Sequence, residues 1–267
     1  MQHFIVIGNP INHSKSPEIH AAFADSVNLP ISYQRQFCPN DADSFVAVVN
    51  AFFAGGGVGA NVTLPFKQIA FDWVKSHGKL SPYAAAAGAV NTLMLVDGKP
   101  YGDNTDGRGL VADLLAQNIA LSGKQVAIVG AGGATRGAIL PLLDAGCQLS
   151  IYNRTKAKAE NLIHTLGYDT VRAGSLDELK CADKFDIIIN ATSATTTGQT
   201  LDLGDCRADF AYDMMYGKPS AFLAHFAHQG ATTSDGYGML IHQAKLAFEQ
   251  WTGKTLDLSQ VNLAKPS

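Results

Sequence analysis

The stretch VAIVGAGGATRG, residues 126–137, decides the fold of this chain. Residues 126–129 are all apolar and run without interruption into Gly130, which predicts a buried strand. An apolar helical pattern follows the glycines, and a second apolar run, LSIY, comes about 20 residues later. A strand, a glycine-rich turn, a helix and a second strand in this order are typical of a dinucleotide-binding βαβ unit.

The glycine-rich turn has the chemistry of a pyrophosphate site. Gly130 and Gly132 permit a tight turn and a close approach of the backbone to a pyrophosphate at the helix N-terminus. The third glycine position of the usual fingerprint holds Thr135, and Pro141 is expected to kink the helix. A plain tight turn is the alternative interpretation, and the strands and helix around the turn make it the weaker one.

The end of the second strand indicates which dinucleotide binds. NAD sites usually place an acid there for the ribose 2′-hydroxyl. This chain reads IYNRTKAK, with Asn153, Arg154, Thr155 and Lys158 in that region. Two cations suit a 2′-phosphate, which an arginine can bind through two parallel hydrogen bonds. A solvated basic helix start is the alternative, although cations in a first turn oppose the helix dipole. The sequence therefore predicts NADP.

The same alternation of short apolar runs and helical patterns extends through most of the chain. It predicts an α/β fold with two domains, an N-terminal domain with a mostly parallel sheet and a Rossmann-type domain that binds NADP. A helix at 110–119 could connect the domains, and the last helix, at 239–251, could return to the first one. The remaining strands are expected at 3–7, 31–37, 58–64, 185–190 and 209–215, and the remaining helices at 17–26, 42–53, 65–75 and 219–228.

Composition excludes several functional classes. A formal net charge of −3 gives no electrostatic reason to expect nucleic acid or an anionic membrane as a partner. No apolar run approaches the ~20 residues of a membrane span, and the N-terminus lacks the pattern of a signal peptide. The four cysteines are far apart, so we expect no metal site and no disulfide framework, but buried thiols in the cytoplasm.

Two segments of the N-terminal half carry chemistry-bearing residues. In NVTLPFK (61–67), Pro65 fits a first helical turn, and Lys67 then lies where the helix dipole favours a neutral amine that can accept a proton. In GNPINHSKSP (8–17), Ser16 and Pro17 fit an N-cap and N1, and the hydroxyls of Ser14 and Ser16 beside free N–H groups suit a carboxylate. Taken singly, Lys67 is better explained as a surface lysine, and Ser16 and Pro17 as a simple helix cap.

Nine segments in order resemble the motif series of the shikimate dehydrogenase family. They are GNPINHSKSP, NVTLPFK, GAVNT (88–92), DNTD (103–106), GAGGATR, NRTKAK, NATS (190–193), YDMMY (212–216) and DGYGMLIHQA (235–244). The resemblance implies reversible hydride transfer between NADP and the ring alcohol of shikimate, with 3-dehydroshikimate as the ketone, in the synthesis of chorismate and aromatic amino acids. It also implies a substrate domain at 1–103 plus 239–267, an NADP domain at 104–238, and a monomer or homodimer.

The resemblance assigns roles to single residues. Lys67 and Asp106 match the family's catalytic pair. Ser14 and Ser16, with Tyr216, match the residues that hold the substrate carboxylate, and the ring hydroxyls are expected to contact Thr63, Asn91, Asp106 and Gln243. Cofactor contacts are expected from Gly130, Ala131, Gly132, Gly133, Ala134, Asn153, Arg154, Thr155, Lys158, Thr192, Ser193, Met214 and Gly238.

Two departures from the family pattern and three alternatives accompany this assignment. Lys158 stands where arginine is common, and Pro82 stands where many members carry an acid near the cofactor. One alternative is a quinate/shikimate dehydrogenase that also uses NAD, and another is a sensor that binds shikimate and NADP without turnover. A folate-type methylene dehydrogenase would also carry a catalytic lysine, but it does not require the paired serines.

Overall fold

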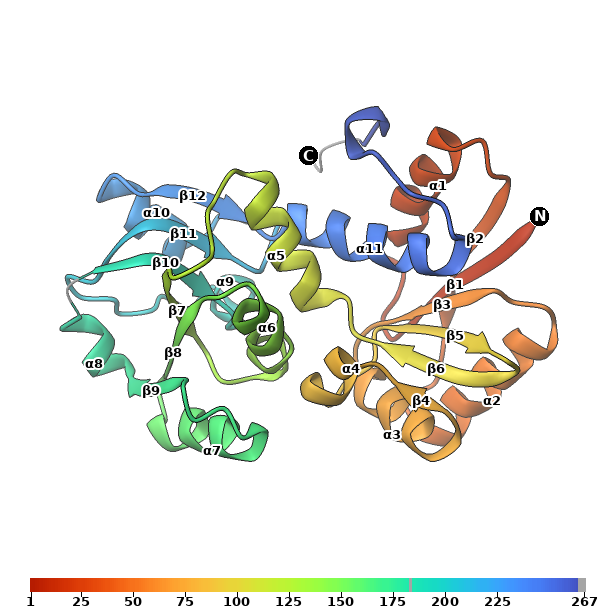
Figure 1. Ribbon diagram of the computed structural model, residues 1–267, viewed down its shortest axis with the longest axis horizontal. Helices are drawn as coiled ribbons and strands as arrows, with labels where there is room; N and C mark the ends of the chain where they lie inside the picture. Colours follow the sequence, from red (N-terminus) through yellow and green to blue (C-terminus); the bar gives the residue numbers. More distant parts are fainter. Residues whose placement is uncertain (183, 264–267) are drawn as a thin grey trace. The chain divides into compact units, whose positions relative to one another are not determined.

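The computed structural model describes residues 1–182 and 184–263 and divides the chain into two compact units. The first unit holds Met1–Gly109 and the segment that starts at Ile241, and the second holds Leu110–Leu240. Both boundaries fall inside a helix, one in α5 (Asp106–Ala116) and one in α11 (Tyr237–Thr252), and Figure 1 labels both helices. Among the described residues, no helix has the length and apolar character to cross a membrane.

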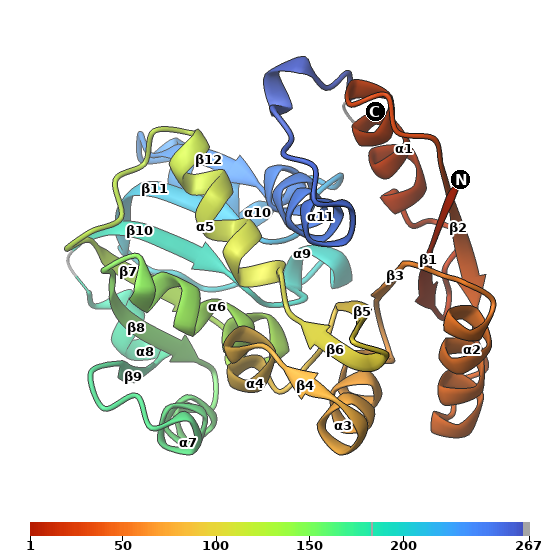
Figure 2. The ribbon, with the colours of Figure 1, turned by 45° about the vertical axis from the view of Figure 1, so that its right-hand side comes forward.

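The second unit contains a six-stranded sheet in which every neighbouring pair is parallel. Its strand order is β12-β11-β10-β7-β8-β9, so the chain starts in the middle, runs to one edge and then returns to build the other half. This is the doubly wound order of a Rossmann fold, as predicted. Figure 2 shows β7 between β8 and β10. The strands are β7 (Gln125–Val129), β8 (Gln148–Asn153), β9 (Arg172–Ser175), β10 (Lys184–Asn190), β11 (Arg207–Asp213) and β12 (Thr232–Asp235).

Helices cover both faces of this sheet, which explains why its central strands are almost wholly apolar. Val126 and Ile128 of β7 pack with residues of α5, α6 and α7, whereas Ala127 and Val129 pack with residues of α8 and α10. The helix α6 continues past Pro141 to Asp144. The helices are α6 (Gly133–Asp144), α7 (Lys156–Leu166), α8 (Leu176–Lys180), α9 (Ala194–Thr197) and α10 (Ala221–His228).

The first unit contains a mixed six-stranded sheet in the order β2-β1-β3-β5-β6-β4. β1 pairs with β2 and β3 in parallel, and β4 pairs with β6 in parallel, but β5 is antiparallel to both of its neighbours. The β5–β6 hairpin was not predicted, although Asp97 and Gly98, both with positive φ, are a known hairpin signal. The strands are β1 (Gln2–Gly8), β2 (Ile31–Phe37), β3 (Gly59–Val62), β4 (Lys79–Leu80), β5 (Thr92–Val96) and β6 (Lys99–Asp103).

Three helix starts differ from the predictions. Helix α1 (Ser16–Ser26) has Lys15 as its N-cap and Ser16 as its first residue, so Ser16 is not the cap. Helix α3 (Lys67–His77) starts two positions after Pro65, which lies in a turn behind a cis peptide bond rather than in the first helical turn. The predicted connecting helix begins earlier than expected, at Asp106, and is α5. The other helices of this unit are α2 (Ala42–Ala54) and α4 (Pro82–Ala87).

Two apolar clusters enclose the first sheet. Ile5, Ile7 and Val62 belong to a cluster that includes residues of α2, α3 and α4. On the other side, Phe4 stacks on Trp251 of α11, and the Trp251 indole donates a hydrogen bond to the Leu93 carbonyl at 3.1 Å. The last helix of the chain is thus part of the core around β1.

A buried histidine lies within that aromatic cluster. The His20 ring of α1 stacks on Tyr33 and Trp251, and neither ring nitrogen has a hydrogen-bond partner among the described residues. Burial lowers the pKa of His20 from 6.5 to about 3, because removal from water disfavours the charged form more than the nearby Asn61 side chain favours it. The folded unit therefore holds His20 neutral.

Replacing His20 should make the protein less sensitive to acid. Below about pH 6.5 the unfolded chain gains a proton at His20 that the folded chain excludes until about pH 3, so stability present at neutral pH is lost by about 1.4 kcal/mol per pH unit. His20→Phe should reduce the loss of unfolding free energy between about pH 7 and about pH 5 by about 2 kcal/mol, measured by urea denaturation. The exposed His3, changed to Gln, is the control, and an unaltered pH profile in His20→Phe would contradict the assignment.

Candidate active site

An ion pair at one edge of the first sheet forms the centre of the candidate site. The Lys67 ammonium lies 2.6 Å from the Asp106 carboxylate, and both side chains are about a quarter exposed. Lys67 opens α3 shortly after β3, and Asp106 opens α5 after β6. Since β5 is antiparallel to both β3 and β6, those two strands end at the same edge, and the two helix starts meet there.

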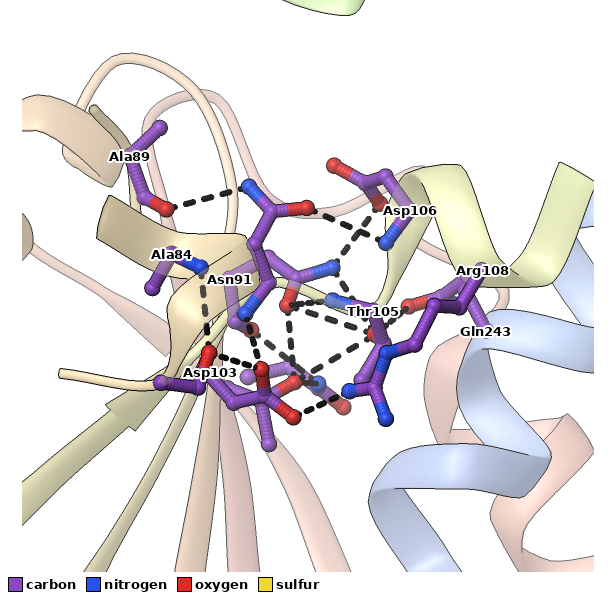
Figure 3. Close-up of polar contacts among 12 residues, drawn as sticks. Ala84, Ala89, Asn91, Asp103, Thr105, Asp106, Arg108 and Gln243 are labelled. Atoms are coloured by element: carbon purple, nitrogen blue, oxygen red, sulfur yellow. Dashed lines mark hydrogen bonds and ion pairs between the residues drawn. The ribbon is translucent and has the colours of Figure 1, made fainter. Parts of the chain in front are cut away.

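The Asn91 side chain fixes the position of Asp106. Its amide nitrogen donates to Asp106 Oδ1 at 2.8 Å and to Thr105 Oγ1 at 3.0 Å (Figure 3). Its amide oxygen accepts from the Thr105 backbone N–H at 2.9 Å and from the Thr92 hydroxyl at 2.8 Å. Asn91 is therefore a fully bonded, buried residue rather than the turn residue that its position alone would suggest.

Neighbouring side chains of the DNTD segment (103–106) make different contacts. Asn104 Oδ1 accepts from the Asp106 backbone N–H at 3.1 Å, and Asn104 Nδ2 donates to the Ala89 carbonyl at 3.0 Å. Asp103 is buried and accepts from the Ser81 hydroxyl and from Arg108, as Figure 3 shows for Arg108. Asn104 is therefore the residue of this segment whose side chain caps the start of α5. The Asp106 carboxylate takes no part in capping and contacts Lys67 and Asn91.

Gln243 and Thr63 lie close to this centre. Gln243 is placed by a side-chain hydrogen bond, and Thr63 by a backbone hydrogen bond and a packing contact. Gln243 of α11 accepts from the Thr105 hydroxyl at 3.4 Å. Thr63 follows β3, its backbone N–H donates to the Ile7 carbonyl, and its methyl group fills the space beside Gly8, where an added Cβ would be 2.5 Å away. In the chain, Thr63 comes before Lys67, and Gln243 comes after Asp106.

The serine loop is joined to the same centre through hydrogen bonds. The Ser14 and Ser16 hydroxyl oxygens lie 3.3 Å apart, and Ser14 Oγ accepts from the Ser16 backbone N–H. Ser16 is linked by a hydrogen bond to the Tyr33 hydroxyl, which in turn donates to Asn61 Oδ1 at 2.6 Å. Burial raises the pKa of Tyr33, and the hydrogen bond with Ser16 opposes this shift.

Asn61 completes the connection. Its amide nitrogen donates to the Asn91 carbonyl at 3.1 Å. Sequence reasoning missed Tyr33, Asn61 and Thr105, although Asn61 is a buried polar residue within an otherwise apolar strand and could have been noticed.

In the second unit, the glycine-rich turn leaves open space at a helix N-terminus. Gly130 has a φ of 112°, and its N–H donates to the Tyr152 carbonyl at 2.7 Å. A Cβ added to Gly132 or Gly133 would meet nothing within 4 Å. Thr135, at the third glycine position, is buried and donates its hydroxyl to the Gly130 carbonyl, which stabilises the turn. The turn, Gly130 to Ala134, fits a phosphate group that binds to backbone N–H groups.

Other predicted cofactor residues gather at the same edge of this sheet. Thr192 follows β10, and its methyl group lies 3.0 Å from where a Gly130 Cβ would be. Ser193 is the next residue and the N-cap of α9. Met214 follows β11, and its N–H donates to the Asn190 carbonyl at 3.0 Å. These residues follow neighbouring parallel strands, where ligands of Rossmann folds bind.

The predicted phosphate clamp lies at the end of β8. Asn153 donates its side-chain amide to the Thr155 carbonyl at 2.9 Å, and Thr155 is the N-cap of α7. Lys156 pairs with Glu178 at 2.7 Å. By contrast, Arg154 and Lys158 are exposed, and neither has an ion-pair partner within the part of the chain that the structure describes. The two cations are therefore available to an anion.

Tyr216 and Gly238 are held within the second unit. The Tyr216 ring lies 6.1 Å from the Tyr237 ring, and burial raises its pKa. Gly238 packs directly on Asp113 of α5, which accepts a hydrogen bond from the buried Tyr212 hydroxyl at 2.7 Å. No group of three or more His, Cys, Asp or Glu side chains suited to a metal occurs among the described residues.

Comparisons with known proteins cover nearly the whole chain. The model of the shikimate dehydrogenase substrate-binding domain matches residues 6–93, that of shikimate/quinate 5-dehydrogenase matches 113–200, and that of the shikimate 5′-dehydrogenase C-terminal domain matches 236–262. The NADP⁺ shikimate dehydrogenase of Psychrobacter cryohalolentis is 54% identical over 98% of this chain and 97% of its own. The chain belongs to the shikimate dehydrogenase family.

Solved structures of similar sequence have the same fold. An Ael1 enzyme from Pseudomonas putida is similar with a TM-score of 0.90 and 38% identity, covering 99% of both chains. Shikimate 5-dehydrogenase from Thermus thermophilus, in complex with NADP(H) and shikimate, has a TM-score of 0.82 and 31% identity, covering 97% of both chains. Membership in the shikimate dehydrogenase family confirms the predicted resemblance and removes the folate-type interpretation.

A double-mutant cycle should show that packing against Asp113 requires glycine at position 238. A Cβ there would lie 2.0 Å from Asp113 Oδ1, so Gly238→Ala should lower the unfolding free energy by about 1–3 kcal/mol. In an Asp113→Ala background the same substitution should cost less, because the obstructing carboxylate is gone. Thermal or urea unfolding of the four proteins measures both steps, and equal costs in the two backgrounds would contradict the packing explanation.

Proposed function

We propose that this chain is an NADP-dependent shikimate dehydrogenase that catalyses the reversible reduction of 3-dehydroshikimate to shikimate, in the synthesis of aromatic amino acids by way of chorismate. The observation that carries the proposal is the Lys67–Asp106 ion pair, held by Asn91, in a chain that the family's models match over residues 6–93, 113–200 and 236–262. A binding protein without turnover would not need a lysine and a carboxylate at this separation.

The substrate roles follow from the chemistry of each cluster. Ser14 and Ser16 offer two hydroxyls beside a helix N-terminus, which suits the substrate carboxylate. We assign Tyr216 to the same carboxylate on the strength of its motif. The ring hydroxyls carry donors and acceptors, as do the side chains proposed to bind them, which are Thr63, Asn91, Asp106 and Gln243.

The proposed reaction needs a group that takes the hydroxyl proton as hydride leaves the same carbon. The Lys67 amine, in its neutral form, accepts that proton and becomes an ammonium, and Asp106 holds the lysine and orients the hydroxyl. Because both Asp106 oxygens already accept hydrogen bonds, one from Asn91 and one from Lys67, the carboxylate is fixed before substrate arrives. In the reverse direction Lys67 returns the proton to the forming alcohol.

The cofactor assignment rests on the open turn and the two exposed cations. NADP accepts or supplies the hydride when bound. The N–H groups from Gly130 to Ala134 are proposed to bind its pyrophosphate, and Arg154 and Lys158, with Asn153 and Thr155, its 2′-phosphate. We further propose contacts with Thr192, Ser193, Met214 and Gly238 at the neighbouring strand ends.

The domain roles, location and assembly are part of the same proposal. Residues 1–103 plus 239–267 bind substrate and residues 104–238 bind NADP, with 183 and 264–267 outside the described residues. The units separate after Gly109 and Leu240, within a few residues of these limits. Free thiols at Cys38, Cys147, Cys181 and Cys206 support a cytoplasmic location. The partners proposed are small molecules, not nucleic acid or membrane, and the chain acts as a monomer or homodimer.

Replacing Lys67 should separate an enzyme from a sensor. Lys67→Ala should lower kcat for shikimate oxidation by about 10²–10⁴-fold, because the proton acceptor is lost, while calorimetry still detects shikimate binding. Lys75→Ala, on the same helix α3, is the control and should keep the parent rate. Absence of NADP-linked oxidation of shikimate by the parent protein would support the sensor instead.

Replacing Arg154 should test the cofactor preference. Arg154→Ala should raise KM for NADP by about ten- to a hundredfold, since a charge-assisted bidentate contact with the 2′-phosphate is lost, and should leave KM for NAD unchanged. Lys156→Ala is the matched control, because Lys156 is paired with Glu178. Equal use of NAD and NADP by the parent, together with turnover of quinate, would favour the broader quinate/shikimate alternative.

A further inference from the structure

The arginine at position 35 holds the serine loop by its backbone. Arg35 lies on the edge strand β2, opposite Val6 of β1. Its Nε and Nη2 both donate to the Ser14 carbonyl, at 3.0 and 2.6 Å. Nη2 also reaches both Glu18 carboxylate oxygens, at 2.6 and 2.9 Å. One guanidinium therefore joins the loop before α1 to the first turn of α1.

These contacts fix the backbone on both sides of Ser16. Ser14 precedes the helix, and its carbonyl lies outside the helical hydrogen-bond pattern, whereas Glu18 is in the first turn. The planar guanidinium permits little rotation once it binds the carbonyl and the carboxylate together. Burial would raise the pKa of Glu18, but the hydrogen bond and charge of Arg35 lower it overall, so Glu18 stays ionised at neutral pH.

We propose that Arg35, held by Glu18, is a positioning residue that sets the Ser14 and Ser16 hydroxyls for the substrate carboxylate. The proposal rests on the proposed function of the serine loop. Because Glu18 balances the Arg35 charge, the arginine acts through the loop geometry, and the carboxylate is bound by neutral hydroxyls and helix N–H groups.

Steady-state kinetics with two substrates tests the proposal. The first substrate is shikimate, and the second is the cyclohexene triol with the same ring hydroxyls but no carboxylate. Arg35→Met should raise KM for shikimate by about five- to twentyfold, with kcat within about twofold and KM for NADP unchanged. KM for the triol should not change. Arg35→Lys, which keeps the charge but not the fork, should give a smaller rise in KM for shikimate.

Two further variants make the result decisive. Ser16→Ala should show the same selective rise in KM for shikimate, and Arg172→Met, the same change on edge strand β9, should match the parent. If KM for shikimate rises in Ser16→Ala but not in Arg35→Met, the role of Arg35 is overturned and the proposed function is left intact. An equal rise for shikimate and the triol in Arg35→Met would also overturn it, because that is general loosening.

The contact of Arg35 with the serine loop can also be tested without turnover. This test applies even if the parent fails to oxidise shikimate, a result that would reject the proposed function. Hydrogen–deuterium exchange of the peptide that covers Ser14–Glu18 should be about tenfold faster in Arg35→Met than in the parent. Arg172→Met should leave this peptide unchanged. Unchanged exchange in Arg35→Met would show that the arginine does not hold the loop.

Discussion

The orientation of one buried amide governs the candidate site. Asn91 Oδ1 accepts from the Thr105 backbone N–H and the Thr92 hydroxyl, so this end of the amide must be the oxygen. Its nitrogen must then face Asp106, and Asp106 Oδ1 is taken by that donor. The other carboxylate oxygen is left for Lys67. A rotated Asn91 amide would place oxygen against carboxylate and leave two donors unsatisfied, so the ion pair has a single low-energy arrangement.

The two sheets form their candidate sites from different chemical groups, backbone N–H groups in one and polar side chains in the other. At the edge of the second sheet, Gly130, Gly132 and Gly133 remove side chains, so that backbone N–H groups face the ligand space. At the edge of the first sheet, buried amides, hydroxyls and carboxylates converge and satisfy one another. In the proposed function the first arrangement binds a phosphate through backbone N–H groups that any nucleotide could use, and selectivity for NADP comes from the end of β8. The second arrangement is specific in itself, because each polar group has a required partner.

Local sequence patterns predicted the elements well but not all of their junctions. The apolar run at 126–129 and the glycines after it specify a strand, a turn and a helix within one short window, and all three occur. The β5–β6 hairpin was missed because its strands carry few of the expected alternations, although the Asp97–Gly98 turn was visible. Pro65 was placed in a helix, but the turn that contains it delays the helix to Lys67.

The site was predicted through motif resemblance more than through local physics. The dipole argument for Lys67 considered only its own helix and could not include Asp106, which comes 39 residues later and meets it only in the folded sheet. Tyr33 and Thr105 carry no local signal, and Asn61 carries only its polarity within an apolar strand, because the contacts of all three are with distant segments. Arg35 likewise resembles an ordinary edge-strand cation until the loop it holds is seen.

The position of Trp251 has a consequence for the order in which the protein is made. Trp251 packs on Phe4 and binds the Leu93 carbonyl, a residue 158 positions earlier in the chain. The strands of the first sheet therefore leave the ribosome long before the helix that covers them, and the whole of Leu110–Leu240 is synthesised in between. The nucleotide-type unit can fold from a continuous segment as it emerges, whereas the unit with Lys67 and Asp106 waits for the end of the chain. The proposed catalytic pair, Lys67 and Asp106, is thus translated before the helix that completes the unit around it.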